Sequence, residues 1–152
     1  MSDAPKVLVS CEGGIARVDI NRPEVRNAFD GETIALLIET FQSLAEDPEA
    51  RVIVLGGRGK SFCAGADLKW MMSMAAKNAL ANSSDANVLA SFFDVVNACP
   101  KPVIGRVHGA VRGGGRIQGS TSRLLVDERT AVPQVGEHVA ARDPLAAARV
   151  RR

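Results

Sequence analysis

Two stretches of small residues decide the fold of this chain: residues 105–115, GRVHGAVRGGG, and residues 61–68, SFCAGADL. Each follows an apolar run that is typical of a buried strand, and each leads toward a predicted helix. Small residues let a ligand approach the backbone closely, and a helix start leaves N–H groups without intrahelical partners. A glycine run alone is more often a flexible turn. Two such turns facing one point would aim two N–H groups at one oxygen, as in an oxyanion hole.

The rest of the first two thirds of the chain alternates between strand and helix patterns. Gly13-Gly14 separates two strand-like runs, which predicts a hairpin. Apolar residues spaced by three and four after Asp30, the expected N-cap, predict an amphipathic helix. Strands are expected at residues 6–11, 15–20, 51–55 and 102–107, with helices at residues 30–46 and 88–98. This order predicts an α/β fold.

The segments between these elements carry less definite patterns. Residues 56–60, GGRGK, read as a loop, and Asp67 is the expected cap of a helix that begins at Leu68. The three methionines in this helix are more often core residues than pocket residues, although Met adapts to irregular shapes. Residues 75–87 are small and polar, which indicates a mobile segment that covers the site.

Composition restricts the function classes. The chain has 152 residues, 46% hydrophobic and 24% charged, with a net charge of +2, so a single domain without strong affinity for nucleic acid is expected. It has three cysteines and no Cys-x-x-Cys pair, which argues against a metal or redox site and favours a reducing compartment. Neither a signal-peptide pattern nor an apolar run long enough for a membrane is seen, so we expect a cytoplasmic protein that does not bind membranes.

The motifs resemble those of the enoyl-CoA hydratase/isomerase (crotonase) family. Residues 61–68, and residues 102–110 with the following glycines 113–115, are similar to its two signatures. Residues 21–29, NRPEVRNAF, resemble a third signature, and residues 67–71, DLKWM, are similar to the methylglutaconyl-CoA hydratase branch. The resemblance implies a spiral of β-β-α units. It covers residues 7–115, so we expect a family core in residues 1–115 that is incomplete at its C-terminal side.

The resemblance also implies a mechanism. The thioester oxygen of an enoyl-CoA accepts hydrogen bonds from the backbone N–H groups of Ala66 and Gly114, and water adds across the 2,3-double bond. One such donor is worth about 3–4 kcal/mol in the transition state. Coenzyme A enters only as part of the substrate, so neither a cofactor nor a metal is expected. Family members form trimers or dimers of trimers, but we expect the helices that build the trimer to be missing here.

Further residues match family positions that border the acyl-CoA. Arg26 suits a phosphate, although an exposed arginine is more often only solvated. Asp67 is less expected to act as a general base, because its role as a helix cap explains it. By motif position, the predicted substrate-binding residues are Arg26, Ala28, Ala64, Asp67, Leu68 and Gly113.

The acid–base group is the weakest part of the resemblance. The first family glutamate falls at Ile117, and Glu128 and Glu137 lie in contexts that do not match the second. An alternative is therefore an inactive remnant that binds acyl-CoA without turnover, because hydration needs a positioned carboxylate. A third alternative is RNA binding, which the few lysines do not favour. His108 is expected to be structural.

Residues 116–152 differ in character from the part before them. From residue 112 onward there are eight arginines and no lysine. We expect a short strand at residues 123–126, a short helix at residues 144–150, and weaker order than in the core. Our hypothesis is that this tail is an out-of-frame or otherwise altered extension, which the nucleotide sequence would test.

Overall fold

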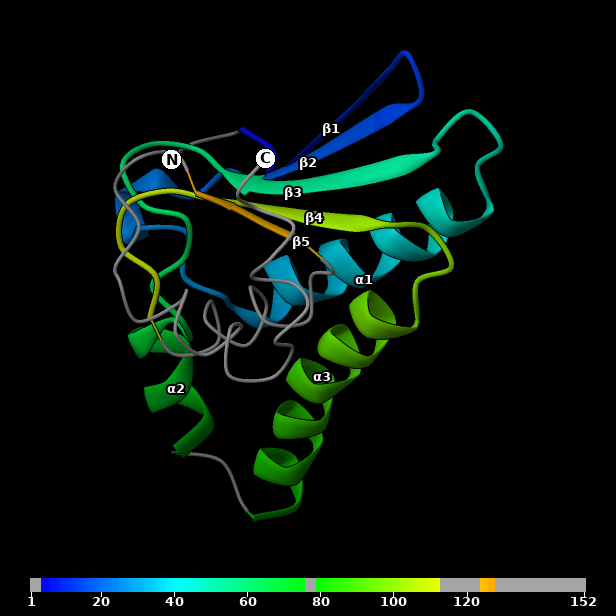
Figure 1. The fold of residues 1–152 in the computed structure, drawn as a ribbon. Coiled ribbons are helices and arrows are strands. Elements are labelled where there is room, and N and C mark those ends of the chain that lie inside the picture. The colour runs from blue at the N-terminus through cyan, green and yellow to red at the C-terminus, as the bar shows by residue number, and fades with distance from the viewer. Residues whose placement is uncertain (1–3, 76–78, 113–123, 128–152) are drawn as a thin grey trace, which may run out of the picture.

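The computed structural model describes residues 4–75, 79–112 and 124–127, which form one sheet covered by helices (Figure 1). The five strands lie in the order β1-β2-β3-β4-β5. Along the chain the elements are β1 (Val7–Glu12), β2 (Ile15–Ile20), the 3-10 turn η1 (Pro23–Val25), α1 (Gly31–Glu46), β3 (Val52–Gly57), α2 (Leu68–Ala75), α3 (Ala79–Ala98), β4 (Val103–Val107) and β5 (Leu124–Asp127). The predicted α/β class is confirmed.

The sheet begins with the expected hairpin. Strands β1 and β2 are antiparallel, and Glu12 lies opposite Ile15 across the turn. Both turn residues have positive φ angles, 58° at Gly13 and 85° at Gly14. Glycine adopts these angles without steric cost, so the paired glycines account for the turn.

Strands β2, β3, β4 and β5 run parallel to one another, and helices connect β2 to β3 and β3 to β4. α1 joins β2 to β3, and α2 with α3 joins β3 to β4, as a parallel pair requires. β5 extends the sheet parallel to β4, with Ile104 opposite Leu124. The short strand expected at residues 123–126 is therefore confirmed with a shift of one residue. The helix expected at residues 144–150 and most of the Arg-rich tail lie outside the described residues.

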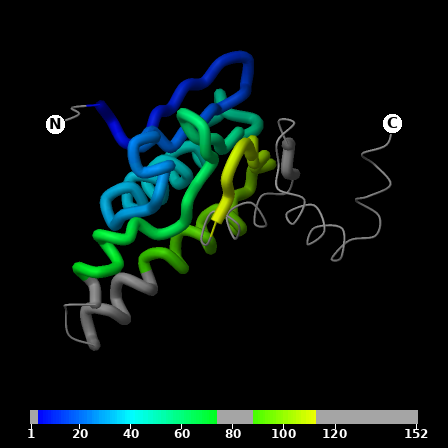
Figure 2. The backbone as a smooth tube through the Cα atoms, turned by 90° about the vertical axis from the view of Figure 1, so that its left-hand side faces the viewer, coloured from blue at the N-terminus to red at the C-terminus, as the bar shows by residue number. Residues whose placement is uncertain are grey.

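The core lies between the sheet and the helices α1 and α3, which pack together beneath it (Figures 1 and 2). Phe92 of α3 is fully buried at its centre. Its ring meets Phe29 edge-on at a centroid distance of 5.8 Å and Phe41 of α1 at 6.2 Å. Burying such a side chain contributes about 1.5–3 kcal/mol, so this aromatic cluster holds the two helices against each other.

The loop expected at residues 56–60 is wrong in its first half, because Gly56 and Gly57 belong to β3 and pair with β2. These glycines are required by close packing. A Cβ on Gly56 would lie 2.5 Å from Asp19 Oδ1, and one on Gly57 would lie 2.5 Å from the Phe62 carbonyl oxygen. Asp19 is distant from Gly56 in the sequence, and Phe62 lies in the turn that follows β3, so the dipeptide alone resembles a turn.

Two expectations about the helices are also wrong. α3 begins at Ala79, nine residues before the expected start, so the polar segment 79–87 is helical. No Gly or Pro occurs there, and alanine favours a helix. In α2, Met71 and Met72 are 49% and 68% exposed, so they are not core residues. Within the described part of the chain, no helix is long and apolar enough to cross a membrane.

Candidate functional site

The two small-residue turns lie side by side where β3 and β4 end. The Phe62 N–H donates to the His108 carbonyl oxygen at 2.9 Å, and the Arg112 N–H donates to that of Cys63 at 3.0 Å. Cys63 and Val111 form a parallel bridge. A Cβ on Gly109, which has a φ of 58°, would collide with the Lys60 carbonyl oxygen. The small residues therefore let two backbones meet.

Residues 21–29, the third signature, pair with the turn at residues 61–68 on the side away from residues 108–112. The Ala64 N–H donates to the Arg26 carbonyl oxygen at 3.0 Å. The Phe29 N–H donates to the Gly65 carbonyl oxygen at 2.8 Å, and the Asp67 N–H donates to that of Phe29 at 2.7 Å. All three segments singled out in the sequence thus meet in one place.

This pairing sets the direction of the Ala66 N–H group. Phe29 and Ala66 form a parallel bridge in which Phe29 uses both of its backbone groups. In a parallel ladder the residue opposite turns its own N–H to the other side. Accordingly, none of the hydrogen bonds within the described ranges uses the Ala66 N–H. The predicted partner donor, Gly114, lies outside those ranges, as does Gly113.

Asp67 caps α2, as expected. Its Oδ1 accepts hydrogen bonds from the N–H groups of Lys69 at 2.9 Å and Trp70 at 3.3 Å. Burial alone would raise the pKa of Asp67, but the Trp70 N–H, the Arg22 guanidinium and the Lys69 N–H hold it below its usual value. An ionised carboxylate with these partners is a poor proton acceptor, which argues against a general-base role.

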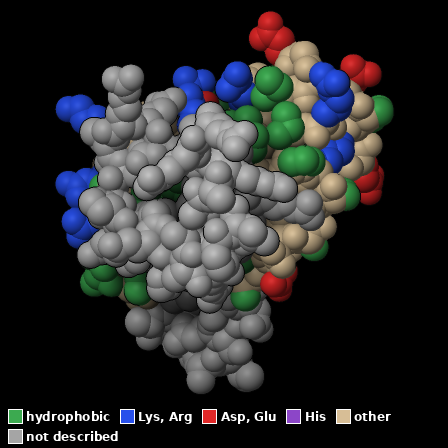
Figure 3. Space-filling view, viewed as in Figure 1, with side chains coloured by type: hydrophobic (Ala, Val, Ile, Leu, Met, Phe, Trp, Pro, Cys, Tyr) green, Lys and Arg blue, Asp and Glu red, His purple; other side chains and the backbone are tan. Residues whose placement is uncertain are grey.

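The remaining predicted site residues surround this turn to different depths. Ala28 is buried, and Ala64 and Ala66 are half-buried. Arg26 is exposed, with a φ of 55°, and Leu68 is 72% exposed. Hydrophobic side chains also reach the surface near the place that α2 occupies in Figure 1 (Figure 3). The contacts of these residues with a substrate stay predictions.

Two other groups near the turn are structural. Burial raises the pKa of the Cys63 thiol to about 12, with a smaller opposing effect of the Gly65 N–H, so the thiol is neutral and unsuited to nucleophilic attack. His108 Nε2 donates a hydrogen bond to the Gly59 carbonyl oxygen at 2.8 Å. Among the described residues, no cluster of His, Cys, Asp and Glu has the form of a metal site.

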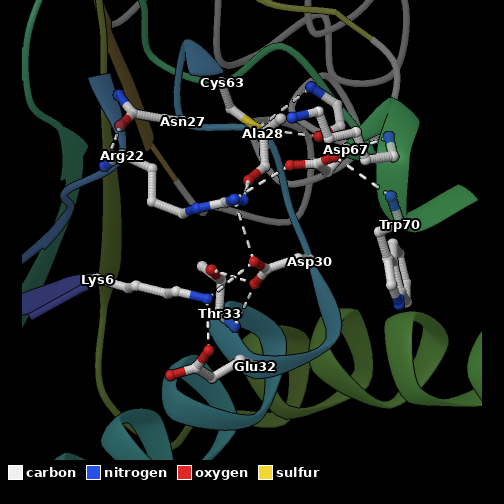
Figure 4. Close-up of polar contacts among 12 residues, drawn as sticks. Lys6, Arg22, Asn27, Ala28, Asp30, Glu32, Thr33, Cys63, Asp67 and Trp70 are labelled. Atoms are coloured by element: carbon white, nitrogen blue, oxygen red, sulfur yellow. Dashed lines mark hydrogen bonds and ion pairs between the residues drawn. The ribbon is translucent and has the colours of Figure 1, made fainter. Parts of the chain in front are cut away.

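Sequence reasoning missed two residues that hold the site together, Asn27 and Arg22. The fully buried Asn27 amide donates to the carbonyl oxygens of Arg58 at 2.8 Å and Ser61 at 2.7 Å. Its Oδ1 accepts from the Arg22 N–H at 2.9 Å. Arg22 forms ion pairs with Asp30 and Asp67 (Figure 4). Both lie in the third signature, but Arg58, Ser61 and Asp67, which they contact, are distant in sequence.

Comparisons with known proteins agree with this architecture. The family model for enoyl-CoA hydratase/isomerase matches residues 10–134. The mitochondrial Delta(3,5)-Delta(2,4)-dienoyl-CoA isomerase of Mus musculus is 35% identical over 119 residues, which are 71% of this chain and 36% of that protein. The chain therefore spans about a third of the length of this relative.

Solved structures have the same fold. A crystal structure of an enoyl-CoA hydratase from Shewanella pealeana superposes with a TM-score of 0.80 at 29% identity, covering 91% of this chain and 57% of that one. Another, from Polaromonas sp. JS666, superposes with a TM-score of 0.78 at 29% identity, covering 82% and 49%. The predicted crotonase-like fold is thus confirmed, and the chain belongs to the enoyl-CoA hydratase/isomerase family.

Proposed function

We propose that this chain is an acyl-CoA enzyme that activates the thioester of a 2,3-unsaturated acyl-CoA. The observation that carries the proposal is the Ala66 N–H, which no acceptor within residues 4–75, 79–112 and 124–127 engages and which is held in a turn between two paired segments. Such a fixed donor stabilises the charge that develops on a thioester oxygen when the acyl group becomes an enolate. Among the described residues it is the group best placed for this chemistry.

Gly114 is the proposed second donor. The parallel bridge between Cys63 and Val111 lies three residues before both Ala66 and Gly114. Three residues of extended chain span at most about 10–11 Å, so the equal separation of Ala66 and Gly114 from the bridge in the sequence allows both N–H groups to reach one oxygen. This spacing supports a shared oxygen between them.

The proposed groove for coenzyme A runs past the exposed Arg26 and the small Ala28 and Ala64, toward Leu68. A guanidinium suits the phosphates of coenzyme A, and the exposed apolar start of α2 suits an acyl chain. The substrate brings coenzyme A with it, so we propose no separate cofactor.

For the reaction, we propose water addition to an enoyl-CoA, with methylglutaconyl-CoA as the favoured substrate because of residues 67–71, DLKWM. Double-bond migration in a dienoyl-CoA is the second candidate, because the mouse relative carries that activity in its name. Both reactions pass through the same polarised thioester, so the donor at Ala66 serves either one.

The proposal is tested on the purified chain by turnover and by binding. Turnover is followed as loss of the conjugated enoyl-thioester absorbance with methylglutaconyl-CoA and with a short enoyl-CoA, and a dienoyl-CoA is supplied separately. Acyl-CoA affinity is measured by calorimetry, with free coenzyme A as the control. Turnover supports the proposal. Binding without turnover of any of these substrates would instead establish the inactive remnant, and failure to bind would exclude both.

A substitution tests the donor itself. Ala66→Pro removes the N–H, which has no acceptor within the described part of the chain. We expect kcat to fall about 10²–10³-fold with the affinity for free coenzyme A unchanged. Wild-type kcat in a variant with a wild-type melting temperature would show that this donor is not used.

A further inference from the structure

Arg22 connects the starts of both helices beside the Ala66 turn (Figure 4). Its Nη2 lies 3.1 Å from Asp30 Oδ2, the N-cap of α1, and 3.1 Å from Asp67 Oδ2, the cap of α2. Its Nη1 donates to the Ala28 carbonyl oxygen at 2.5 Å. One guanidinium therefore holds two helix caps and the segment between them.

The cluster is largely shielded from water, apart from Glu32, and its two cations face three carboxylates. The side chains of Arg22, Asp30 and Asp67 are 12%, 18% and 11% exposed. Lys6 adds a second cation, 2.9 Å from Asp30 Oδ2, and the exposed Glu32 completes the group. Removing one member of a shielded ion pair leaves the other uncompensated. A planar guanidinium also fixes several acceptors at once, which a lysine does not.

The contacts of Arg22 lie next to the two bonds that orient the Ala66 N–H. Those bonds join Phe29 to Gly65 and to Asp67. Arg22 holds Ala28, which precedes Phe29, and Asp67, which follows Ala66. Arg22 thus binds both paired segments, each at a residue adjacent to the bridge between Phe29 and Ala66.

We propose that Arg22 is a positioning residue, which sets the direction of the Ala66 N–H toward the thioester oxygen by locking Ala28 to Asp67. The inference rests on the proposed function. It assigns Arg22 an effect on thioester polarisation that is separate from holding the fold. A displacement of about 1 Å in a catalytic group, caused by a distant change, can lower the rate about 100-fold. Loss of the Arg22 contacts should therefore reduce activity even where the chain stays folded.

The test uses a β-ketoacyl-CoA, which reports on polarisation without turnover. When this compound ionises, the proton between its two carbonyl groups goes to solvent and the electron pair spreads over the carbonyl oxygens. Donors aimed at the thioester oxygen favour this enolate, whose absorbance is measured against pH in the bound state. Wild-type protein is compared with Arg22→Gln and with Arg17→Gln, a control for an exposed arginine on β2.

For wild type and for Arg17→Gln we expect the enolate to form at a lower pH when bound than when free. For Arg22→Gln we expect the enolate fraction at a fixed pH to fall toward that of the free compound, and kcat on an enoyl-CoA to fall about 100-fold, with KM changed far less. Binding of free coenzyme A, which has no thioester, should be unchanged.

Two further variants keep the test decisive if Arg22→Gln does not fold. Arg22→Lys keeps the positive charge but loses the planar guanidinium with its several N–H donors. We therefore expect the bound enolate fraction to lie between those of wild type and Arg22→Gln. Asp67→Asn keeps a capping oxygen but loses the carboxylate. We expect Asp67→Asn to lower the bound enolate fraction as much as Arg22→Gln does. The variant that combines Arg22→Gln with Asp67→Asn should lower it no further.

The outcomes separate this inference from the function on which it rests. If wild type binds the β-ketoacyl-CoA without favouring its enolate, the proposed function fails. If wild type favours the enolate and folded Arg22→Lys and Asp67→Asn do so equally, only the positioning role of Arg22 is overturned.

Discussion

Helices α1 and α2 begin in the same way and then differ. Each starts with an aspartate whose Oδ1 accepts from the N–H three residues on, at 2.8 Å for Asp30 and 3.3 Å for Asp67, and Arg22 holds both carboxylates. α1 then buries one face completely, including Leu37 and Phe41. α2 leaves apolar side chains in contact with solvent, such as the 68% exposed Met72.

The difference shows what holds each helix. α1 is stabilised by apolar burial, which is worth about 1.5–3 kcal/mol for each large side chain, and its cap adds less. Among the side chains of α2 that the structure describes, residues 68–73, only Trp70 is partly buried against the core, so the contacts of the cap weigh more in deciding where this helix begins. A helix held in this way can place a backbone donor while its apolar side chains stay free for a ligand.

The largest expected effect follows from the burial of α1. Phe41→Ala should lower the free energy of unfolding by about 3–5 kcal/mol, because it leaves a cavity beside Phe92. The matched change in α2, Met72→Ala, should cost less than about 0.5 kcal/mol, because that side chain is exposed. Urea unfolding followed by far-UV circular dichroism measures both. Equal losses would show that α2 is buried as α1 is.

A smaller effect separates the two caps. Asp30→Ala should lower the free energy of unfolding by about 0.5–2 kcal/mol, because α1 forms part of the core. Asp67→Ala should act locally and shift the fluorescence of Trp70, the only tryptophan, before the circular dichroism changes. Urea titrations followed by both signals test this. Coincident transitions in Asp67→Ala would mean that α2 unfolds only with the core.

The smallest effect concerns pH. Burial would raise the pKa of Asp30, but the Thr33 hydroxyl, Lys6, the Thr33 N–H and Arg22 hold it below its usual value, and the pKa of Asp67 is also lowered. Because both pKa values are lower in the folded state, this stabilisation is full above the unfolded pKa of about 4 and is lost as pH falls through the folded values.

Urea midpoints measured between about pH 6 and pH 2 should therefore fall more steeply for wild type than for an Asp30→Asn, Asp67→Asn double variant. The double variant should already be less stable at the upper end of this range. Parallel curves for the two proteins would show that these carboxylates do not contribute.

The elements that depend on near neighbours in the chain were predictable from the sequence. Paired glycines at residues 13–14 predict a hairpin, and spacings of three and four after Asp30 predict α1, because a turn and a helix are both made within a few residues. The motifs, through their resemblance to a family, predicted the fold and indicated Ala66. Its role as a donor stays a prediction.

Only the tertiary structure decided which contacts join distant segments. Gly56 is a strand residue because β3 pairs with β2, where Asp19 lies opposite it, and Arg22 meets Asp67 across 45 residues of chain. The exposure of Met72 depends on what packs over α2, which helical spacing does not state. Periodicity indicates which side chains share a face of a helix or strand, but which segment packs against that face depends on the tertiary structure. The contacts of Arg22 with Ala28 and Asp67 beside Ala66 likewise form only in the folded chain.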